Sequence, residues 1–402
     1  MTSFITSFYI KLKINRALYY IALFIFSINI LFSEITPLES KFLWILRDSL
    51  TSPEKIEKAF SFASNSGFNK VFIQVRGRGY AFYNSTLVPK NPLVNVNFDP
   101  LEYAIQLGKR YNLEVHIWFN TYILWSSNYK PKNLNHIYHT QKSWTEANTY
   151  GKMDHSINLK SPKIPNWEGI YLSPLHPDVN PYLNSLIKEI IENYNIDGIH
   201  FDYIRYQDEI YGYNEQGRNK FEKLYSIDPS DIAKGIISTR FGWSQEFVDS
   251  TKNMWNKFRQ DAITEFLESI SESVTSSNKN IQLSAAVKPN LLTAKKRFFQ
   301  NWDSWLNDGL LDFVVPMNYY SEFKYFNDDL KMMKFFIDEK LHNRIVMGVA
   351  TYNQSSEDAA DKILISRLNG FVGVSIFSYD AHKNNLDWFY PVIHAINYSK
   401  KE

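Results

Sequence analysis

The chain has 402 residues, with 44 Lys and Arg against 42 Asp and Glu, and it has no cysteine. A net charge of +2 gives no basic face of the kind that binds nucleic acid. The absence of thiols excludes disulfides, cysteine nucleophiles and thiolate zinc sites. The length fits two or three average domains, or one large barrel with insertions.

The N-terminal residues 1–33 have the pattern of a targeting segment. Lys11, Lys13 and Arg16 precede an apolar run from Ala17 to Phe32. A basic region followed by a short apolar core is typical of a secretory signal peptide, and the run is shorter than the ~20 residues that span a bilayer. An uncleaved membrane anchor and a buried first helix are the alternatives. We expect an exported protein that is periplasmic, extracellular or anchored at its N-terminus, with no other membrane contact.

Eight short apolar segments alternate with segments of helical periodicity after residue 40. The expected strands are Phe42–Arg47, Lys70–Arg76, Leu113–Asn120, Gly198–Tyr203, Ile281–Val287, Asp312–Asn318, Arg344–Thr351 and Gly373–Ser378. Near-continuous apolar runs are expected for parallel strands that are covered on both faces. Strand followed by helix, repeated eight times, predicts an α/β protein with one (β/α)8 TIM barrel over residues 41–398.

Two connections in this barrel are much longer than the others. One runs from Thr121 to Pro177 after the third strand, and the other from Gln207 to Ser244 after the fourth. Long loops in compact domains are usually functional or disordered. Both leave the carboxyl ends of strands, where barrel enzymes carry their active sites.

Polar and aromatic side chains gather at the same strand ends. His200 and Asp202 alternate along the fourth strand and therefore point to the same side. From spacing alone, Asp202 is either a catalytic carboxylate or a buried acid that pairs with Arg205 or Arg76, and both interpretations stay open. The candidate substrate-binding residues are Arg76, Trp118, Asn120, His200, Arg205, Lys288, Asn318 and Tyr319.

The two long connections also contain aromatic and histidine side chains. We expect one or two of five tryptophans to touch a ligand, namely Trp118, Trp125, Trp144, Trp167 and Trp243. The spacing of His136, His139 and His155 fits no zinc motif, and no carboxylate stands at a matching offset. The sequence therefore predicts neither a metal nor a cofactor.

Four segments resemble the glycosyl-hydrolase-like family 10 barrels. They are Phe72–Tyr83 (FIQVRGRGYAFY), Glu114–Asn120 (EVHIWFN), Asp197–Arg205 (DGIHFDYIR) and Pro316–Tyr319 (PMNY). The resemblance covers the chain from about Lys41 to about Asn397. It implies a TIM barrel that hydrolyses glycosides of a cell-envelope or extracellular polysaccharide, including peptidoglycan strands stripped of their peptides. Asp202 matches the family's acidic residue on the fourth strand, whereas Asn301 stands where the family often has an aspartate.

Glycoside hydrolysis usually needs a second carboxyl group beside the first. Asp380, after the eighth strand, is the first candidate for this catalytic partner of Asp202. Asp208, Glu209 and Asp48 are further candidates. A faint similarity to chitinases fails because Ile204 stands where their acid is. An N-acetyl sugar that serves as its own nucleophile is another possibility.

Two functions follow from these observations. The first is a glycoside hydrolase with Asp202 at its centre and a polysaccharide or oligosaccharide as substrate. The second is a barrel that binds glycan without cutting it, which the lack of an obvious second acid permits. An intracellular phosphate-binding enzyme is disfavoured by the leader and by the lack of a Gly-rich turn after the last two strands.

Overall fold

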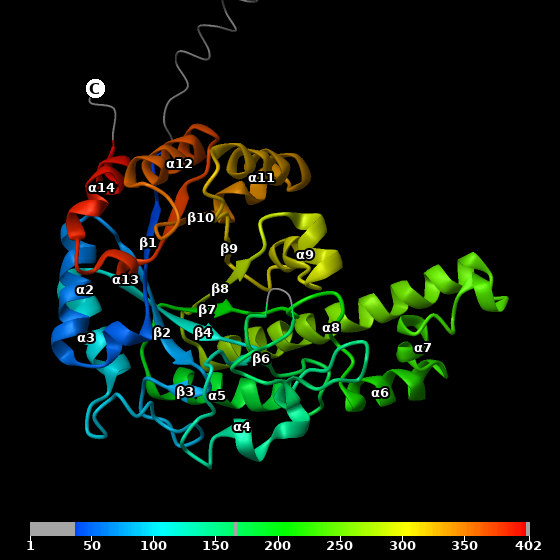
Figure 1. The fold of residues 1–402 in the computed structure, drawn as a ribbon. Coiled ribbons are helices and arrows are strands. Elements are labelled where there is room, and N and C mark those ends of the chain that lie inside the picture. Colours follow the sequence, from blue (N-terminus) through cyan, green and yellow to red (C-terminus); the bar gives the residue numbers. More distant parts are fainter. Residues whose placement is uncertain (1–36, 165–166, 399–402) are drawn as a thin grey trace, which may run out of the picture.

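The computed structural model describes residues 37–164 and 167–398. Eight parallel strands form a barrel in the order β10-β11-β1-β2-β4-β7-β8-β9, and the bridges Val314–Ile345 and Met317–Gly348 join β9 to β10 (Figure 1). The strands are β1 (Ser40–Ile45), β2 (Lys70–Gly77), β4 (Glu114–Asn120), β7 (Gly198–Asp202), β8 (Gln282–Val287), β9 (Phe313–Pro316), β10 (Val346–Ala350) and β11 (Gly373–Phe377). The predicted (β/α)8 barrel is therefore confirmed, and each expected strand lies within two residues of an observed one.

The barrel interior is filled mainly with aromatic side chains. Phe42 and Trp44 of β1 point inward, whereas Leu43 and Ile45 pack against the outer helices. Phe42 stacks on Phe72 of β2 with 4.1 Å between the ring centroids. Because side chains alternate along a strand, the apolar runs supply both the inner core and the outer layer. This filling occupies the lower barrel, and a cavity opens at the carboxyl ends of the strands.

Helices surround the barrel and connect its strands. They are α2 (Pro53–Asn65), α3 (Pro100–Tyr111), α5 (Val179–Asn193), α8 (Gln245–Ser277), α9 (Leu291–Arg297), α10 (Trp302–Asn307), α11 (Phe323–Phe336), α12 (Ser356–Leu368), α13 (Tyr379–His382) and α14 (Tyr390–Asn397). The Asp99 side chain caps α3 by accepting hydrogen bonds from the N–H groups of Leu101 and Glu102. In α5, Leu183, Leu186 and Ile190 form the buried stripe that faces the sheet.

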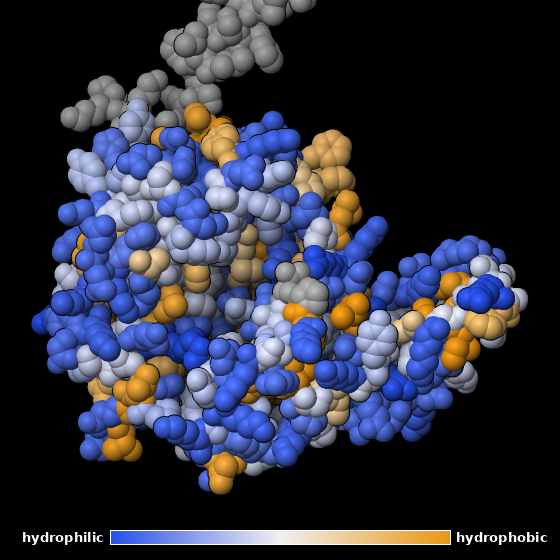
Figure 2. Space-filling model, viewed as in Figure 1, coloured by the Kyte–Doolittle hydropathy of each residue, from blue (hydrophilic) through white to orange (hydrophobic). Residues whose placement is uncertain are grey.

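The two long connections have structure of their own. After β4, β5 (Ile123–Trp125) pairs with β6 (Ile170–Tyr171), and α4 (Ile137–Thr140) lies between them. After β7, α6 (Glu215–Tyr225) and α7 (Pro229–Ala233) accompany the 33-residue helix α8. Figure 1 shows that the N-terminal part of α8 projects beyond the barrel. Figure 2 shows hydrophobic side chains gathered at the far end of this projection, where Ile236, Phe241 and Trp243 are exposed.

Two buried acids join these long connections to each other. Oε2 of Glu146 accepts the N–H of Gly212 at 2.7 Å. Oδ2 of Asp154 accepts the N–H of Tyr171 at 2.9 Å and a hydrogen bond from Nε2 of Gln207 at 2.8 Å. Burial raises the pKa of Glu146 to about 7, and burial with the Glu146 charge also raises the pKa of Asp154. The two connections are thus held together by acids that favour their protonated form.

We predict that this junction makes stability depend on pH. Folded Glu146 keeps its proton to about pH 7, whereas an unfolded glutamate releases it near 4.5. Between these values the folded state binds more protons, so the free energy of unfolding falls as pH rises, by about 1.4 kcal/mol per pH unit for this group. Urea unfolding at pH 5 and pH 7 should show a smaller fall for Glu146→Gln than for wild type. The exposed control Glu268→Gln should keep the wild-type fall, and an unchanged fall in Glu146→Gln would contradict the prediction.

The predicted leader at residues 1–33 lies outside the described residues. Among the helices of residues 37–164 and 167–398, none combines the length and the hydrophobicity needed to cross a bilayer.

Candidate active site

A cavity of about 530 Å³ opens at the carboxyl ends of the barrel strands. Its lining combines aromatic rings with charged and amide side chains from all eight strand ends and from the long connection after β4. The lining residues are Trp44, Leu46, Arg47, Gln74, Trp118, Asn120, Ile123, Ser126, Glu168, Asp202, Tyr203, Arg205, Lys288, Met317, Tyr319, Tyr352 and Phe377. A mostly apolar pocket with a few convergent polar groups is the usual form of a ligand site.

Asp202 is the last residue of β7 and borders this cavity with 7% of its surface exposed. The indole N–H of Trp118 donates to Oδ2 at 3.1 Å, and the backbone N–H of Tyr203 donates to Oδ1 at 2.7 Å. Burial raises the pKa of Asp202 to about 6, although the Arg205 charge and these two donors favour the anion. Asp202 therefore holds a proton at higher pH than an ordinary aspartate and is stabilised after losing it.

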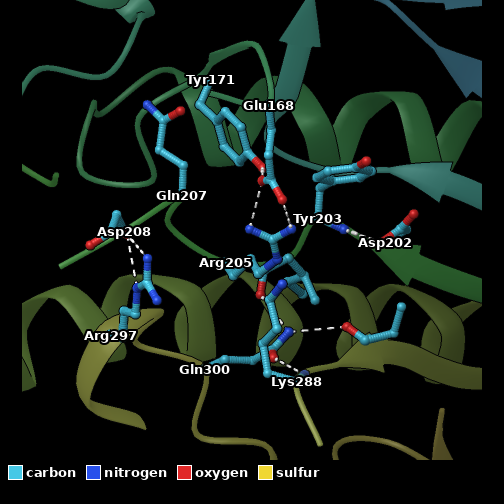
Figure 3. A network of polar contacts seen from close by, with 12 residues as sticks. Glu168, Tyr171, Asp202, Tyr203, Arg205, Gln207, Asp208, Lys288, Arg297 and Gln300 are labelled. Atoms are coloured by element: carbon cyan, nitrogen blue, oxygen red, sulfur yellow. Dashed lines mark hydrogen bonds and ion pairs between the residues drawn. The ribbon is translucent and has the colours of Figure 1, made fainter. Parts of the chain in front are cut away.

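Glu168 faces the same cavity from the connection after β4. Figure 3 shows its carboxylate above the guanidinium of Arg205, which donates to Oε2 from Nη1 and to Oε1 from Nη2, both at 3.0 Å. The hydroxyl of Tyr171 also donates to Oε2. Burial raises the pKa of Glu168, but the charge and hydrogen bonds of Arg205 lower it further, to about 2. Glu168 is the only carboxylate besides Asp202 among the described lining residues, so one cavity contains a proton-holding acid and an ionised one.

Aromatic rings form the floor and one wall of the cavity. Trp44 meets Trp118 edge-on at 4.7 Å, and Tyr319 stacks on Phe377 at 5.5 Å between ring centroids. Burial and the Asp202 charge raise the pKa of Tyr203, so its hydroxyl stays neutral. Flat apolar faces beside hydrogen-bonding groups are suited to sugar rings, which present both C–H faces and hydroxyls.

Five of the eight predicted substrate-binding residues line this cavity. They are Trp118, Asn120, Arg205, Lys288 and Tyr319. The Oδ1 atom of Asn120 accepts a hydrogen bond from Gln74 at 3.3 Å. Their position agrees with the expectation that side chains at the carboxyl ends of the strands share one site. Their role in binding substrate stays a prediction.

The other three candidates lie elsewhere, so their predicted contact with substrate is not supported. Arg76 is buried behind the barrel wall, where Nη1 donates to the carbonyls of Asn120 and Thr121. His200 lies in the packed interior beneath the cavity, with Nδ1 2.9 Å from Oγ of Ser284. Burial lowers the pKa of His200 well below its ordinary range, so it is neutral.

Asn318 is the third of these residues and is also buried. Its Nδ2 donates to the carbonyl of Phe326 at the start of α11, at 2.9 Å. This contact fixes the turn after β9. The neighbouring Tyr319 takes the place in the cavity instead.

Asp380 is likewise absent from the lining, and its carboxylate serves another purpose. Oδ2 accepts the N–H of Leu46 at 2.7 Å, and Oδ1 accepts hydrogen bonds from Ser49 at 2.6 Å and Lys383 at 2.9 Å. These bonds tie α13 to the end of β1. The geometry therefore favours a structural role for Asp380 over the catalytic one predicted from sequence.

The remaining acids named from sequence also lie away from the cavity. Asp208 is paired with Arg297 at 2.5 Å and borders a smaller neighbouring cavity of about 160 Å³. Glu209 and Asp48 are exposed and are absent from the lining. Among the described residues, the geometry selects Glu168 in their place.

Sequence reasoning did not find Glu168, and it also did not find Arg47, Gln74 and Tyr352. Glu168 belongs to a long irregular connection, where no periodicity indicates the direction of a side chain. The one available signal was its position beside Trp167 in a connection that leaves a strand end. Arg47 directly follows the first strand and could have been found by the rule applied to the other strand ends.

Of the five tryptophans, only Trp118 lines the main cavity, and Trp167 lines the smaller one beside it.

His136, His139 and His155 each have a separate partner, respectively the Arg78 carbonyl, the Pro131 carbonyl and the Thr145 hydroxyl. Within residues 37–164 and 167–398, no three or more His, Asp or Glu side chains converge as metal ligands.

A larger groove of about 800 Å³ lies outside the barrel between α5, α6 and α8. Its side chains include Asn180 and Asn184, which already donate to groups on α8. The cavity of about 530 Å³ at the strand ends is the better candidate site, because buried Asp202 and the ion pair of Glu168 with Arg205 both line it.

Comparisons with known proteins agree with this fold and identify the family. A family model described as "Glycosyl hydrolase-like 10" matches residues 41–363. The glycosyl hydrolase DigH of Escherichia coli K12 is 29% identical over 142 residues, which are 34% of this chain and 30% of the relative. The glycosyl hydrolase YngK of Bacillus subtilis is 22% identical over 282 residues, 63% of this chain and 46% of the relative. The chain thus matches less than half the length of these relatives.

Solved structures with the same fold include glycosidases. The PgaB (BpsB) glycoside hydrolase domain of Bordetella bronchiseptica has a TM-score of 0.69, with 13% identity over 90% of this chain and 100% of that domain. The catalytic domain of a Paenibacillus polymyxa β-amylase has a TM-score of 0.55, with 12% identity over 90% of this chain and 100% of that domain. At such identities the likeness establishes the barrel fold alone. The family match covers most of the chain, which therefore belongs to the glycosyl-hydrolase-like family 10.

Proposed function

We propose that this protein hydrolyses glycosidic bonds in a cell-envelope or extracellular polysaccharide, including peptidoglycan strands stripped of their peptides. Asp202 is the general acid, and Glu168 is the second carboxyl group. The observation that carries this proposal is that the two acids line one cavity and hold a proton with different affinities, with pKa values of about 6 and about 2. Two carboxyl groups whose surroundings separate their pKa values are what glycoside hydrolysis needs.

Asp202 protonates the glycosidic oxygen as the bond to the anomeric carbon breaks. The proton moves from the carboxyl group to the leaving oxygen, and Asp202 becomes an anion. The N–H groups of Trp118 and Tyr203 and the charge of Arg205 stabilise this anion. The same contacts fix the orientation of the carboxyl group, so little reorganisation accompanies the proton transfer.

Glu168 provides negative charge while positive charge develops on the sugar ring. Its ion pair with Arg205 keeps it ionised and fixes its position (Figure 3). A carboxylate in this place stabilises the oxocarbenium-like transition state. A water molecule forms the new bond to the anomeric carbon, and Glu168 takes the proton that this water loses. The aromatic rings of Trp118 and Tyr319 support the sugar rings on either side of the bond.

The proposed place of action rests on the predicted leader at residues 1–33 and on the family resemblance. An exported or N-terminally anchored protein meets envelope and extracellular glycans, and the chain's family resemblance implies the same substrates. We therefore propose that the barrel acts outside the cytoplasm, and detection of the protein in periplasmic, membrane and culture fractions tests this.

Release of reducing ends tests the hydrolysis itself. The full chain is incubated with peptidoglycan strands before and after removal of their stem peptides, and with other envelope polysaccharides. New reducing ends and shorter fragments, identified by mass spectrometry, are expected from at least one of these glycans and not from an Asp202→Asn protein.

The alternative function, a glycan-binding barrel without activity, rests on the engagement of Glu168 by Arg205 and Tyr171. Binding without products would favour it.

A further inference from the structure

Among the described residues that line the cavity, cations outnumber carboxylates. Its charged lining residues are Arg47, Arg205 and Lys288 against Glu168 and Asp202. Arg205 and Glu168 satisfy each other through their paired hydrogen bonds. When Asp202 holds the proton that it donates, it is neutral. The ammonium of Lys288 and the guanidinium of Arg47 then have no ion-pair partner among the described lining residues.

Lys288 follows β8 and is held firmly by its backbone. Its N–H donates to Oε1 of Gln300 at 2.8 Å, and Nε2 of Gln300 donates to the carbonyl of Ala286 at 3.0 Å. The half-buried ammonium has no hydrogen bond and no ion pair within the described part of the chain, and it lies 4.6 Å from the centre of the Phe298 ring. The backbone of Lys288 is therefore fixed, whereas its ammonium is available to bind a ligand.

The surroundings of Lys288 raise the free energy of its charged form when no ligand is bound. The charge of Arg205, burial and the charge of Arg297 lower the pKa of Lys288 to about 8, and Glu168 and Asp202 oppose this only in part. A cation held beside other cations in a half-buried place gains free energy when an anion binds. A neutral sugar hydroxyl would recover less of that cost, because bonds between ionised groups are stronger.

Arg47 provides a similar group on the opposite wall. It follows β1, which is four strands from β8 in the closed order of the barrel. Nη1 of Arg47 donates to Oε1 of Gln74 at 3.0 Å, and within residues 37–164 and 167–398 no carboxylate forms an ion pair with it. Cations on both walls, with aromatic rings between them, are expected of a site for a glycan that carries negative groups.

We propose that the cavity binds a glycan whose sugars carry an oxyanion, either a carboxylate or a phosphate, and that Lys288 binds this group beside Asp202. The inference rests on the proposed glycan site and extends it, because it identifies the chemical class of the sugar and a residue that determines specificity. An ammonium accepts carboxylate and phosphate alike as a point charge, so the experiment distinguishes the two.

Binding is measured by calorimetry in the Asp202→Asn background, where no turnover interferes. The ligands are a chitin oligosaccharide, its C6-oxidised form with carboxylates, and its C6-phosphorylated form. We expect at least one charged ligand to bind about tenfold or more tightly than the neutral one. The better of the two charged ligands identifies the group. Equal affinity for all three ligands would overturn the inference.

Variants then assign the preference to Lys288. Lys288→Met should lose about tenfold or more in affinity for the charged ligand and less than threefold for the neutral one, whereas Lys288→Arg should keep most of the preference. Lys296→Met, which removes an exposed cation of α9 outside the cavity, is the matched control and should change neither affinity. An equal loss for both ligands in Lys288→Met would show a merely structural role and overturn the proposal.

The outcomes also separate this inference from the proposed hydrolysis. A preference for charged ligands without products from wild type would sustain the binding site and reject the enzyme. Products from neutral and charged glycans at equal rates, together with equal affinities, would sustain the enzyme and reject the inference.

Discussion

Asp202→Asn should lower kcat/KM for glycan hydrolysis by about 10² to 10⁴. The amide has the same shape, but its single oxygen can accept only one of the hydrogen bonds that Trp118 and Tyr203 donate to the two carboxylate oxygens, and the amide has no acidic proton to give to the leaving oxygen. Replacing the buried charge removes a desolvation cost that offsets the lost hydrogen bond, so the melting temperature at pH 7 should change little. Reducing-end release, calorimetric glycan binding and thermal unfolding measure the three quantities.

Asp380→Asn is the matched control for this substitution. Asp380 also follows a barrel strand, but its oxygens are bound to Leu46, Ser49 and Lys383 rather than facing the cavity. We expect a loss of about 1–3 kcal/mol in the free energy of unfolding and activity within tenfold of wild type. If Asp380→Asn were inactive while folded and Asp202→Asn were active, the roles that the geometry gives to these acids would be reversed.

Glu168→Gln should also lower kcat/KM by about 10² to 10⁴, because the charge that stabilises the transition state disappears. The change leaves Arg205, which is 3% exposed, without an anionic partner. Removing one partner of a buried ion pair typically costs about 3–5 kcal/mol, so the unfolding transition should move to lower temperature. Steady-state kinetics well below that transition separates the loss of activity from the loss of stability.

Asp208→Asn is the matched control for Glu168→Gln. It breaks another carboxylate–arginine pair, with Arg297, but that pair is partly exposed and lies outside the main cavity. We expect at most about 1 kcal/mol of destabilisation and near wild-type activity. Comparable losses of activity in the two variants would indicate a general effect on the connections rather than a role of Glu168 in the reaction.

The barrel could be predicted from sequence because its strands are apolar on both faces. Trp44 and Leu43 show why, since one fills the interior and the other packs against helices, and both are fully or almost fully buried. The helical stripe of α5 is equally plain. The bounds of the strands shifted by a residue or two, because hydrogen bonding rather than hydrophobicity decides where a ladder ends.

The site could be predicted in part, where a simple alternation continues to the strand end. Trp118 and Asn120 of β4 point into the cavity by this rule, and Asp202 does so on β7. Arg76 breaks the rule because the pairing of β2 with β4 shifts register between Gln74 and Arg76, and its side chain lies against Phe119 on the outer side.

The sequence also failed to predict where His200 and Glu168 lie relative to the cavity, for a different physical reason in each case. His200 does point inward, but the rings of Trp44 and Phe72 pack against it at 4.8 and 4.1 Å and close the interior above it. Glu168 could not be placed at all, because its position depends on the pairing of β5 with β6 and on Arg205, which are contacts between distant parts of the chain. Such tertiary contacts leave no local pattern.

The pH dependence of kcat/KM tests the central claim, that Asp202 donates a proton from inside the cavity. The substrate should be a neutral oligosaccharide, so that ionisation of Lys288 does not contribute. Since the acid must be protonated and its pKa is about 6, kcat/KM should be level below pH 6 and fall about tenfold per pH unit above it. A value that stays level or rises between pH 6 and pH 8 would contradict the account.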